Sequence, residues 1–380
     1  MAQILHFADL HLDRSFAGVG IYSREASRRR EELRAALRRI VDMALARGVD
    51  ALTVGGELYE HDRVTIDTGR FIAREFERLA PTPVLVAAGN HDPLVSDSLH
   101  RRIDWPSNVR IFDSMEWTSF ELNDGVRVWG VGHDGPSVRQ RLLDDLRVDT
   151  SDPNVALLHG SDLGSVPERK VAHCPFERAD VAASGTRFVL LGHYHGMRLS
   201  PSDSPTYGYP GSPDPLGFDE TGQHYVLLLD VNGDSTKVEA IPINQAFYRT
   251  EQIDVSDMAT SDEVREAIAR LAAEGTSDRE IVRVTLVGQA DTELRIDEHA
   301  LLSATADLFR YLDVVDETTV AFPIGELAGE ATTRGAFVRI MNARIEAAAG
   351  PERERLERAR LYGLRAFENQ EVRRRADHAD

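Results

Sequence analysis

Cysteine and long apolar runs are scarce in this sequence. Cys174 is the only cysteine, so no disulfide can form within the chain and a reducing compartment is expected. No run approaches the roughly 18 apolar residues of a membrane-spanning helix. The sequence opens directly on an apolar strand segment, without the basic and apolar stretches of a secretory leader. We therefore expect a cytoplasmic protein that makes no contact with a membrane.

Positive charge is scarce too. The chain has 44 Lys and Arg residues against 63 Asp and Glu, a net charge of −19, and only Lys170 and Lys237 are lysines. A broadly basic DNA-binding surface is excluded, because contacts to phosphate need clustered Lys and Arg. Any binding of nucleic acid must be local, assisted by metal or shared with a partner.

The first 245 residues carry the pattern of a mixed α/β domain. Apolar segments alternate with helical periodicity over Ser23–Gly48 and Thr68–Leu79, and this β-α-β-α-β order predicts parallel strands. Turn signals at Asn123-Asp124-Gly125 and Asn232-Gly233 predict hairpins. The expected fold class over residues 1–245 is therefore α/β, a β-sandwich of two mixed sheets flanked by helices.

The pattern changes after residue 245. Residues 246–328 indicate a small α/β capping domain, with one helix capped by Thr260 and Glu263, a second helix over about Asp297–Leu312 and a strand near Thr318–Val320. Residues 329–380 indicate a helical tail, and residues 331–380 contain 11 Arg against 8 acidic residues. Its amphipathic helices must bury their apolar faces either on their own domain or on a partner.

Metal-ligand chemistry recurs at the ends of five apolar segments in the first domain. In open α/β sheets, the carboxyl ends of the strands meet at one edge, so residues far apart in sequence converge there. Each residue alone has a structural alternative, such as a helix cap, a turn, a core histidine or an ordinary loop acid. Taken together, they predict one metal centre made of Asp9, His11, Glu57, Asn90, His159, His193 and His195.

These side chains suit two divalent ions. Carboxylate, amide and imidazole are the ligands of divalent metals that hydrolyse phosphate esters. Two such ions, about 3.5–4 Å apart, can stabilise both the attacking and the leaving oxygen of an in-line displacement. The expected cofactor is therefore a pair of divalent metal ions.

The order of the motifs resembles a known family. Asp-x-His, Gly-Gly-Glu, Gly-Asn-His-Asp, His-Gly and Gly-His-x-His in succession are similar to the calcineurin-like metallophosphoesterases. Phe-Ala-Asp-Leu-His-Leu, Gly-Glu-Leu-Tyr-Glu-His-Asp and Tyr-Pro-Gly-Ser-Pro resemble their SbcD/YhaO branch of DNA repair exonucleases. The resemblance implies hydrolysis by a hydroxide that two metal ions activate, with Mn²⁺ the expected metal and Mg²⁺ the alternative.

The resemblance also implies a role for each site residue. Glu57 stands where the family has a bridging Asp, a departure that lengthens the reach of the carboxylate. The implied catalytic residues are His91, beside the scissile phosphate, and Asp92, which would orient its imidazole. Gly211 and Ser212 would donate to the phosphate, with a plain turn as the alternative. The implied metal ligands are Asp9, His11 and His195 for one ion and Asn90, His159 and His193 for the other.

The function expected from these observations is that of a nuclease subunit that cuts DNA in repair. Its second domain would guide the duplex, and its tail would dock on an SMC-like ATPase with a coiled coil. A homodimer is left open. The alternatives are a phosphodiesterase or phosphatase for a small nucleotide or phosphoprotein, and a weakly active metal-binding subunit, for which Glu57 is the one argument.

Overall fold

The computed structural model describes residues 2–21, 23–122, 125–149, 151–164, 171–232, 235–273, 279–291 and 294–367. The chain divides into two compact units, one of residues 1–249 with 279–281 and one of residues 250–278 with 282–380. Among the helices of the described part, none is long and apolar enough to span a membrane.

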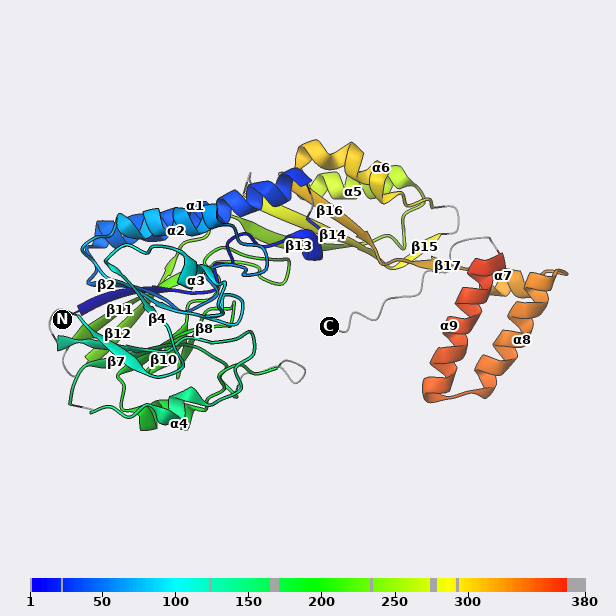
Figure 1. Cartoon of the computed structure of the whole chain (residues 1–380). Helices are drawn as coiled ribbons and strands as arrows, with labels where there is room; N and C mark the ends of the chain where they lie inside the picture. The colour runs from blue at the N-terminus through cyan, green and yellow to red at the C-terminus, as the bar shows by residue number, and fades with distance from the viewer. Residues whose placement is uncertain are drawn as a thin grey trace. The chain divides into compact units, whose positions relative to one another are not determined.

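Two six-stranded sheets form the first unit (Figure 1). The first sheet has the order β12-β11-β1-β2-β3-β4, with strands Ser235–Pro242, Tyr225–Asn232, Ala2–Phe7, Ala51–Val54, Val84–Ala87 and Val109–Phe112. The second has the order β5-β6-β7-β8-β10-β9, with strands Thr118–Glu121, Arg127–Gly130, Asn154–His159, Phe188–Gly192, Tyr207–Tyr209 and Arg198–Ser200. The predicted sandwich of two mixed sheets is confirmed.

Parallel pairing in the centre of each sheet brings the strand ends together. In the first sheet β1 to β4 are parallel neighbours, and in the second β6, β7, β8 and β10 are. Antiparallel pairs complete both sheets, including β5 with β6 and β11 with β12. The predicted turn residues 123–124 and 233 lie outside the described residues, although residues on either side of them pair as the hairpins require.

The core of this unit lies between the two sheets. Inward residues of the first sheet, such as Phe112 and Leu229, pack against Leu157 and Leu190 of the second. Each large apolar side chain buried there contributes roughly 1.5–3 kcal/mol. Gly130 of β6 has to be a glycine, because a Cβ there would lie 2.1 Å from the Phe112 ring.

Helices flank the sandwich, as expected. Helix α1, Ser23–Arg47, and helix α2, Ile66–Glu77, lie along the first sheet, whereas α4, Arg178–Ser184, lies beside the second (Figure 1). Gly48 ends α1 in the left-handed conformation, with φ of 64°. The short helix α3, Leu99–Arg102, and the single turns η1, Ala17–Val19, and η3, Leu142–Asp145, complete the helical parts of this unit that the structure describes.

The second unit contains most of a three-stranded sheet, β13-β14-β16, of Phe247–Asp254, Glu280–Val287 and Tyr311–Asp316, although the first residues of β13 and β14 belong to the first unit. Its helix α5, Ser261–Ala273, has the predicted capping box. The Glu263 carboxylate accepts from Thr260 N at 3.0 Å, and Thr260 Oγ1 accepts from Glu263 N at 3.3 Å. A short parallel pair, β15 of Gln289–Asp291 and β17 of Thr319–Ala321, follows.

The predicted helix over Asp297–Leu312 is wrong in its second half. Helix α6 covers Glu298–Thr305, a single turn η4 covers Ala306–Leu308, and β16 starts at Tyr311. Leu312 and Val314 are buried while their neighbours are more exposed, which is the alternation of a strand rather than of a helix.

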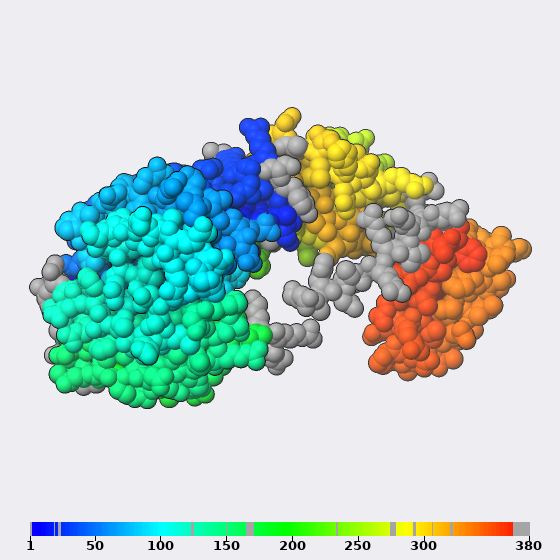
Figure 2. Space-filling model, viewed as in Figure 1, coloured from blue at the N-terminus to red at the C-terminus, as the bar shows by residue number. Residues whose placement is uncertain are grey.

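The tail folds into three helices, α7 of Ile324–Gly329, α8 of Thr333–Ala347 and α9 of Gly350–Phe367, which pack side by side in orange and red in Figure 2. Val338 of α8, Leu364 of α9 and Leu327 of α7 form a small core. Gly363 allows the close crossing of α8 and α9, since a Cβ there would lie 2.2 Å from the Phe337 ring.

Candidate metal centre

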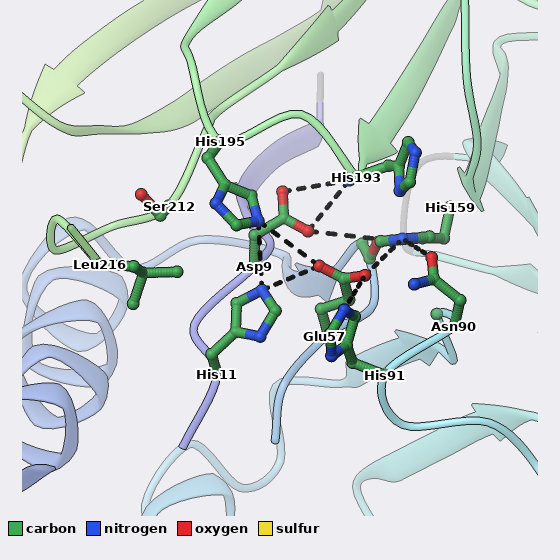
Figure 3. A network of polar contacts seen from close by, with 12 residues as sticks. Asp9, His11, Glu57, Asn90, His91, His159, His193, His195, Ser212 and Leu216 are labelled. Carbon is green, nitrogen blue, oxygen red and sulfur yellow. Dashed lines mark hydrogen bonds and ion pairs between the residues drawn. The ribbon is translucent and has the colours of Figure 1, made fainter. Parts of the chain in front are cut away.

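The strand ends bring the predicted ligands to one place (Figure 3). Asp9 and His11 follow β1, Glu57 follows β2, and Asn90 follows β3. In the second sheet, His159 ends β7, and His193 and His195 follow β8. Among the described residues, there are three groups whose potential ligand atoms all lie within 4.8 Å of one another. One is His11, Glu60 and His91. The two clusters made only of predicted ligands are His11, Glu57 and His195, and Glu57, His159 and His193.

Glu57 belongs to both clusters, and its two oxygens face different ones. Its Oε2 lies 2.8 Å from His11 Nε2 and 3.6 Å from His195 Nε2. Its Oε1 lies 3.2 Å from His159 Nε2. The side chain is only 2% exposed. Despite its longer reach, the glutamate thus has the position that a bridging carboxylate requires.

Asp9 and Asn90 stand beside these clusters. Asn90 Oδ1 lies 3.0 Å from His159 Nε2. Asp9 Oδ1 lies 3.9 Å from His159 Nδ1, and both oxygens of Asp9 accept from the backbone N–H of His193, at 2.9 and 3.1 Å. All seven predicted ligands therefore line a single site.

The backbone at the site adopts unusual conformations. Asp9, His11, Glu57 and His193 all have positive φ, at 54°, 50°, 54° and 112°. Such conformations cost about 1–3 kcal/mol each for residues other than glycine, and they cluster at ligand clamps. Hydrogen bonds between the two loops hold them, from Asp9 N to Gly56 O at 3.0 Å and from His11 N to Glu57 O at 2.9 Å.

Outer acceptors turn three of the imidazoles toward the centre. His11 Nδ1 lies 2.8 Å from Glu60, His195 Nδ1 lies 2.6 Å from Glu220, and His159 Nδ1 lies 2.8 Å from the Gly55 carbonyl. Each ring therefore presents Nε2 to the clusters, a usual arrangement of metal-binding histidines. His193 differs, because its Nδ1 is buried without a hydrogen-bond partner in the described structure.

The electrostatics of the site favour positive charge between its carboxylates. Burial raises the pKa of Asp9, and the charge of Glu57 raises it further. Burial opposes protonation of His159, but the charge and hydrogen bond of Glu57, the charge of Asp9 and the Gly55 carbonyl together outweigh it and raise the pKa of His159 to about 9. Burial lowers the pKa of His193 to about 2, which keeps this ring neutral. Buried carboxylates that draw protons onto histidines, together with an orphaned His193 Nδ1, fit a site for divalent cations.

His91 stands at the exposed side of the site. Its side chain is 45% exposed, with Nε2 3.8 Å from Glu57 Oε1 and Nδ1 2.8 Å from Glu60 Oε2. Glu60 thus contacts His91 through one oxygen and His11 through the other. Glu60, and not Asp92 as expected, makes the contact that orients the His91 ring.

Asp92 fastens two loops together. It is fully buried, and its carboxylate accepts from the backbone N–H groups of Gly89, Glu57 and Leu58 at 2.7, 2.9 and 3.0 Å. A further contact, at 3.1 Å, joins it to His100 Nε2. These bonds fix the loop of Glu57 against the loop of Asn90, so Asp92 acts on the shape of the site.

Gly211 and Ser212 lie directly against His195 and its backbone. Ser212 is fully buried, its backbone N–H donates to the His195 carbonyl at 3.0 Å, and its hydroxyl donates to Glu220 at 2.6 Å. A Cβ on Gly211 would lie 2.4 Å from the His195 carbonyl oxygen. The expectation that Ser212 donates to phosphate is corrected, because its N–H and its hydroxyl already donate to His195 and Glu220. The expectation for the Gly211 backbone stays a prediction.

Two carboxylates of the site were missed in the sequence. Glu60 follows Glu57 by three residues in the Gly-Glu-Leu-Tyr-Glu-His-Asp motif, so a signal was present. Glu220 lies 25 residues after His195 in an irregular loop, where no periodicity points to it. Both contact the outer nitrogen of a histidine.

The sequence profile of the calcineurin-like phosphoesterase family matches residues 2–197, and the chain belongs to this family. It is a metal-dependent hydrolase of phosphoester bonds, as predicted. The chain is similar to the "Uncharacterized metallophosphoesterase YhaO" of Bacillus subtilis, with 28% identity over 299 residues, 75% of this chain and 72% of the relative.

Two archaeal relatives carry the name "DNA double-strand break repair protein Mre11". The protein of Aeropyrum pernix is 27% identical over 277 residues, which are 68% of this chain and 64% of the relative. The protein of Haloferax volcanii is 24% identical over 324 residues, 81% of this chain and 68% of the relative. The predicted resemblance to the DNA repair branch of the family is confirmed.

Proposed function

We propose that this protein is a Mn²⁺-dependent DNA nuclease that works with an SMC-like ATPase in DNA repair. The observation that carries the proposal is the single site of seven metal-ligand side chains with Glu57 between its two clusters. Relatives named for the repair of DNA double-strand breaks support DNA as the substrate.

The seven ligands are proposed to bind two metal ions that take part in hydrolysis. Asp9, His11 and His195 would hold one ion and Asn90, His159 and His193 the other, with Glu57 between them. The two ions, when bound, acidify water and neutralise charge on the phosphate. Cytoplasmic Mg²⁺ is the alternative metal, and oxygen-rich ligands such as Asp9, Glu57 and Asn90 accept both.

His91 is placed to act on the scissile bond. Its Nδ1–H donates to Glu60, which leaves Nε2 at the exposed side of the site. Because Glu60 holds Nδ1, Nε2 is the ring atom that can donate a proton to the leaving oxygen of the phosphodiester as the bond breaks. Glu60 also holds His11, so one carboxylate aligns the acid with the metal ligands.

The second unit is proposed to guide the duplex and to dock the ATPase. The α8–α9 hairpin buries Val338, Met341 and Ile345, whereas Ile340 is 60% exposed and Phe367 is also exposed. Part of the apolar stripe therefore packs internally, and part faces outward. An amphipathic surface of this kind fits a coiled-coil partner, and the partner would add basic surface that this acidic chain lacks.

Incubation of the purified protein with labelled duplex and single-stranded DNA tests the nuclease. We expect cleavage with Mn²⁺, less with Mg²⁺ and none with EDTA, and His91→Ala serves as the control for contaminating nucleases. Hydrolysis of a small phosphodiester without any cleavage of DNA, with and without the ATPase, would instead identify a phosphodiesterase for small nucleotides.

A further inference from the structure

A loop after β10 packs against His195 on the side away from Glu57. We call it the His195 cradle and define it by Gly211, Ser212, Leu216, Glu220 and His224. Figure 3 shows Ser212 and Leu216 on the side of His195 that faces away from Glu57. The mechanism described above uses none of these residues.

Glu220 is the centre of the cradle. Its Oε1 lies 2.6 Å from His195 Nδ1. Its Oε2 accepts from the Ser212 hydroxyl at 2.6 Å and from the Leu216 backbone N–H at 2.9 Å. Its side chain is only 9% exposed. The carboxylate therefore has one oxygen reserved for His195 and the other fixed by its own loop.

The remaining cradle residues fix the backbone on both sides of this contact. Ser212 N donates to the His195 carbonyl, and Gly211 is close enough to that carbonyl to exclude any side chain. His224 Nδ1 lies 2.7 Å from the Ser212 carbonyl, and its Nε2 lies 3.2 Å from the Glu220 carbonyl. His195 is thus held by its backbone and by its ring.

A buried ion pair anchors the cradle to α1. Asp214, fully buried, accepts from Arg29 at 2.6 Å, from Arg39 at 3.1 Å and from the Gln245 backbone N–H at 3.2 Å. Arg29 is itself fully buried and also donates to the Pro215 carbonyl at 2.8 Å. Movement of the loop that carries Glu220 would therefore break the buried hydrogen bonds and ion pairs of Asp214 and Arg29.

We infer that Glu220 is a positioning residue that fixes the orientation of His195 for one of the two metal ions. The inference rests on the proposed metal chemistry. Glu220 contacts a ligand of the His11, Glu57 and His195 cluster, whereas the outer contact of His159 in the other cluster is a backbone carbonyl. Loss of such an outer carboxylate typically weakens metal binding about 10–100-fold. The effect should therefore fall on one ion and spare the other.

Titration calorimetry of the full chain with Mn²⁺ tests this inference. In Glu220→Ala, we expect the affinity for one of two ions to fall about 100-fold and the other to stay within about two-fold. In the nearly isosteric Glu220→Gln, the amide oxygen can still accept from His195, but the amide NH2 group can accept from neither the Ser212 hydroxyl nor the Leu216 backbone N–H, so a fall of about 10-fold is expected. Asp219→Asn, which removes an exposed charge from the same loop, should bind both ions as the wild type does.

Thermal melting shows whether each variant is folded. If Glu220→Ala is unfolded, the Mn²⁺ affinities of Glu220→Gln test the inference instead. Folded Glu220 variants that bind both ions as tightly as the wild type would overturn the inference, and so would an equal loss in Asp219→Asn. A wild type that binds Mn²⁺ but cleaves no DNA would refute the proposed nuclease while the affinities still decide the role of Glu220. A wild type that takes up no Mn²⁺ would overturn the metal centre itself.

Discussion

The strand-end edge of the first unit and the helical tail of the second are stabilised in different ways. At the edge, Asp9, His11, Glu57 and His159 are buried polar groups, and several of them have strained backbone conformations. In the tail, α7 to α9 pack a few apolar side chains and expose pairs such as Arg353–Glu357. The buried carboxylates and the strained backbone of the edge destabilise the fold unless a cation neutralises the carboxylates. The tail, in contrast, is stabilised by ordinary helix packing.

Because of this difference, substitutions at the strand-end edge should change the chemistry, whereas substitutions in the tail should change only stability or partner binding. A substitution at the edge should change activity far more than stability if metal binding is the purpose of the arrangement. A substitution on the exposed face of the tail should change neither. The following predictions test this separation, from the largest expected effect to the smallest.

Replacement of Glu57 should have the largest effect. Glu57→Gln keeps the size of the side chain but removes the charge between the two clusters, so we expect hydrolysis of a small phosphodiester to fall about 10³-fold. Glu57→Asp is the matched control and should retain activity, since it restores the bridging residue of the family. Equal activity of Glu57→Gln and the wild type would rule out a bridging role.

The buried pair of Arg29 and Asp214 should dominate stability. Arg29→Met leaves Asp214 buried with one fewer cation, and breaking a buried pair in this way costs about 3–5 kcal/mol of unfolding free energy. Arg28→Met, at the neighbouring exposed position on α1, should cost less than about 1 kcal/mol. Urea denaturation measures both, and similar values for the two variants would show that the pair does not anchor the cradle.

The metal-ligand residues at the strand ends could be predicted from the sequence, because each directly follows its own strand. An apolar run that ends at Phe7 or at Leu158 shows where the next ligand lies, and parallel pairing of the strands brings these ligands together. Glu220 could not be predicted in this way, because the path of an irregular loop depends on tertiary contacts such as Asp214 with Arg29. The role that the family resemblance implied for Asp92 was wrong, because its buried carboxylate contacts backbone N–H groups and His100 instead of His91.

Helix boundaries show the same limit. The segment after Asp297 combines good helix formers with Tyr311, Leu312 and Val314, and local propensity does not separate the two parts. Pairing with β14 in the three-stranded sheet decides that residues 311–316 form a strand. Where tertiary pairing determines the structure, periodicity within a single segment is insufficient.

His91→Ala should have an intermediate effect that is confined to chemistry. Loss of a positioned acid typically reduces turnover about 10²-fold, and the exposed ring contributes little to packing. Mn²⁺ affinity should stay within about three-fold of the wild type, because His91 lies outside the proposed ligand set. Calorimetry with Mn²⁺ beside single-turnover kinetics distinguishes these effects. Loss of an ion in this variant would show that His91 is a metal ligand instead.

The smallest effect on stability is expected at Ile340, and it tests the role of the tail. Ile340 is exposed on α8, whereas the next residue, Met341, is buried. Met341→Gln should cost about 2 kcal/mol or more, because it places an amide in an apolar contact, but Ile340→Gln should stay within about 0.5 kcal/mol. Both variants should hydrolyse a small phosphodiester at the wild-type rate while folded.

If the exposed face of α8 binds the ATPase, Ile340→Gln alone should lose the partner without losing stability, which co-purification with the ATPase measures. Full retention of the partner by Ile340→Gln would show that this face of α8 does not dock it.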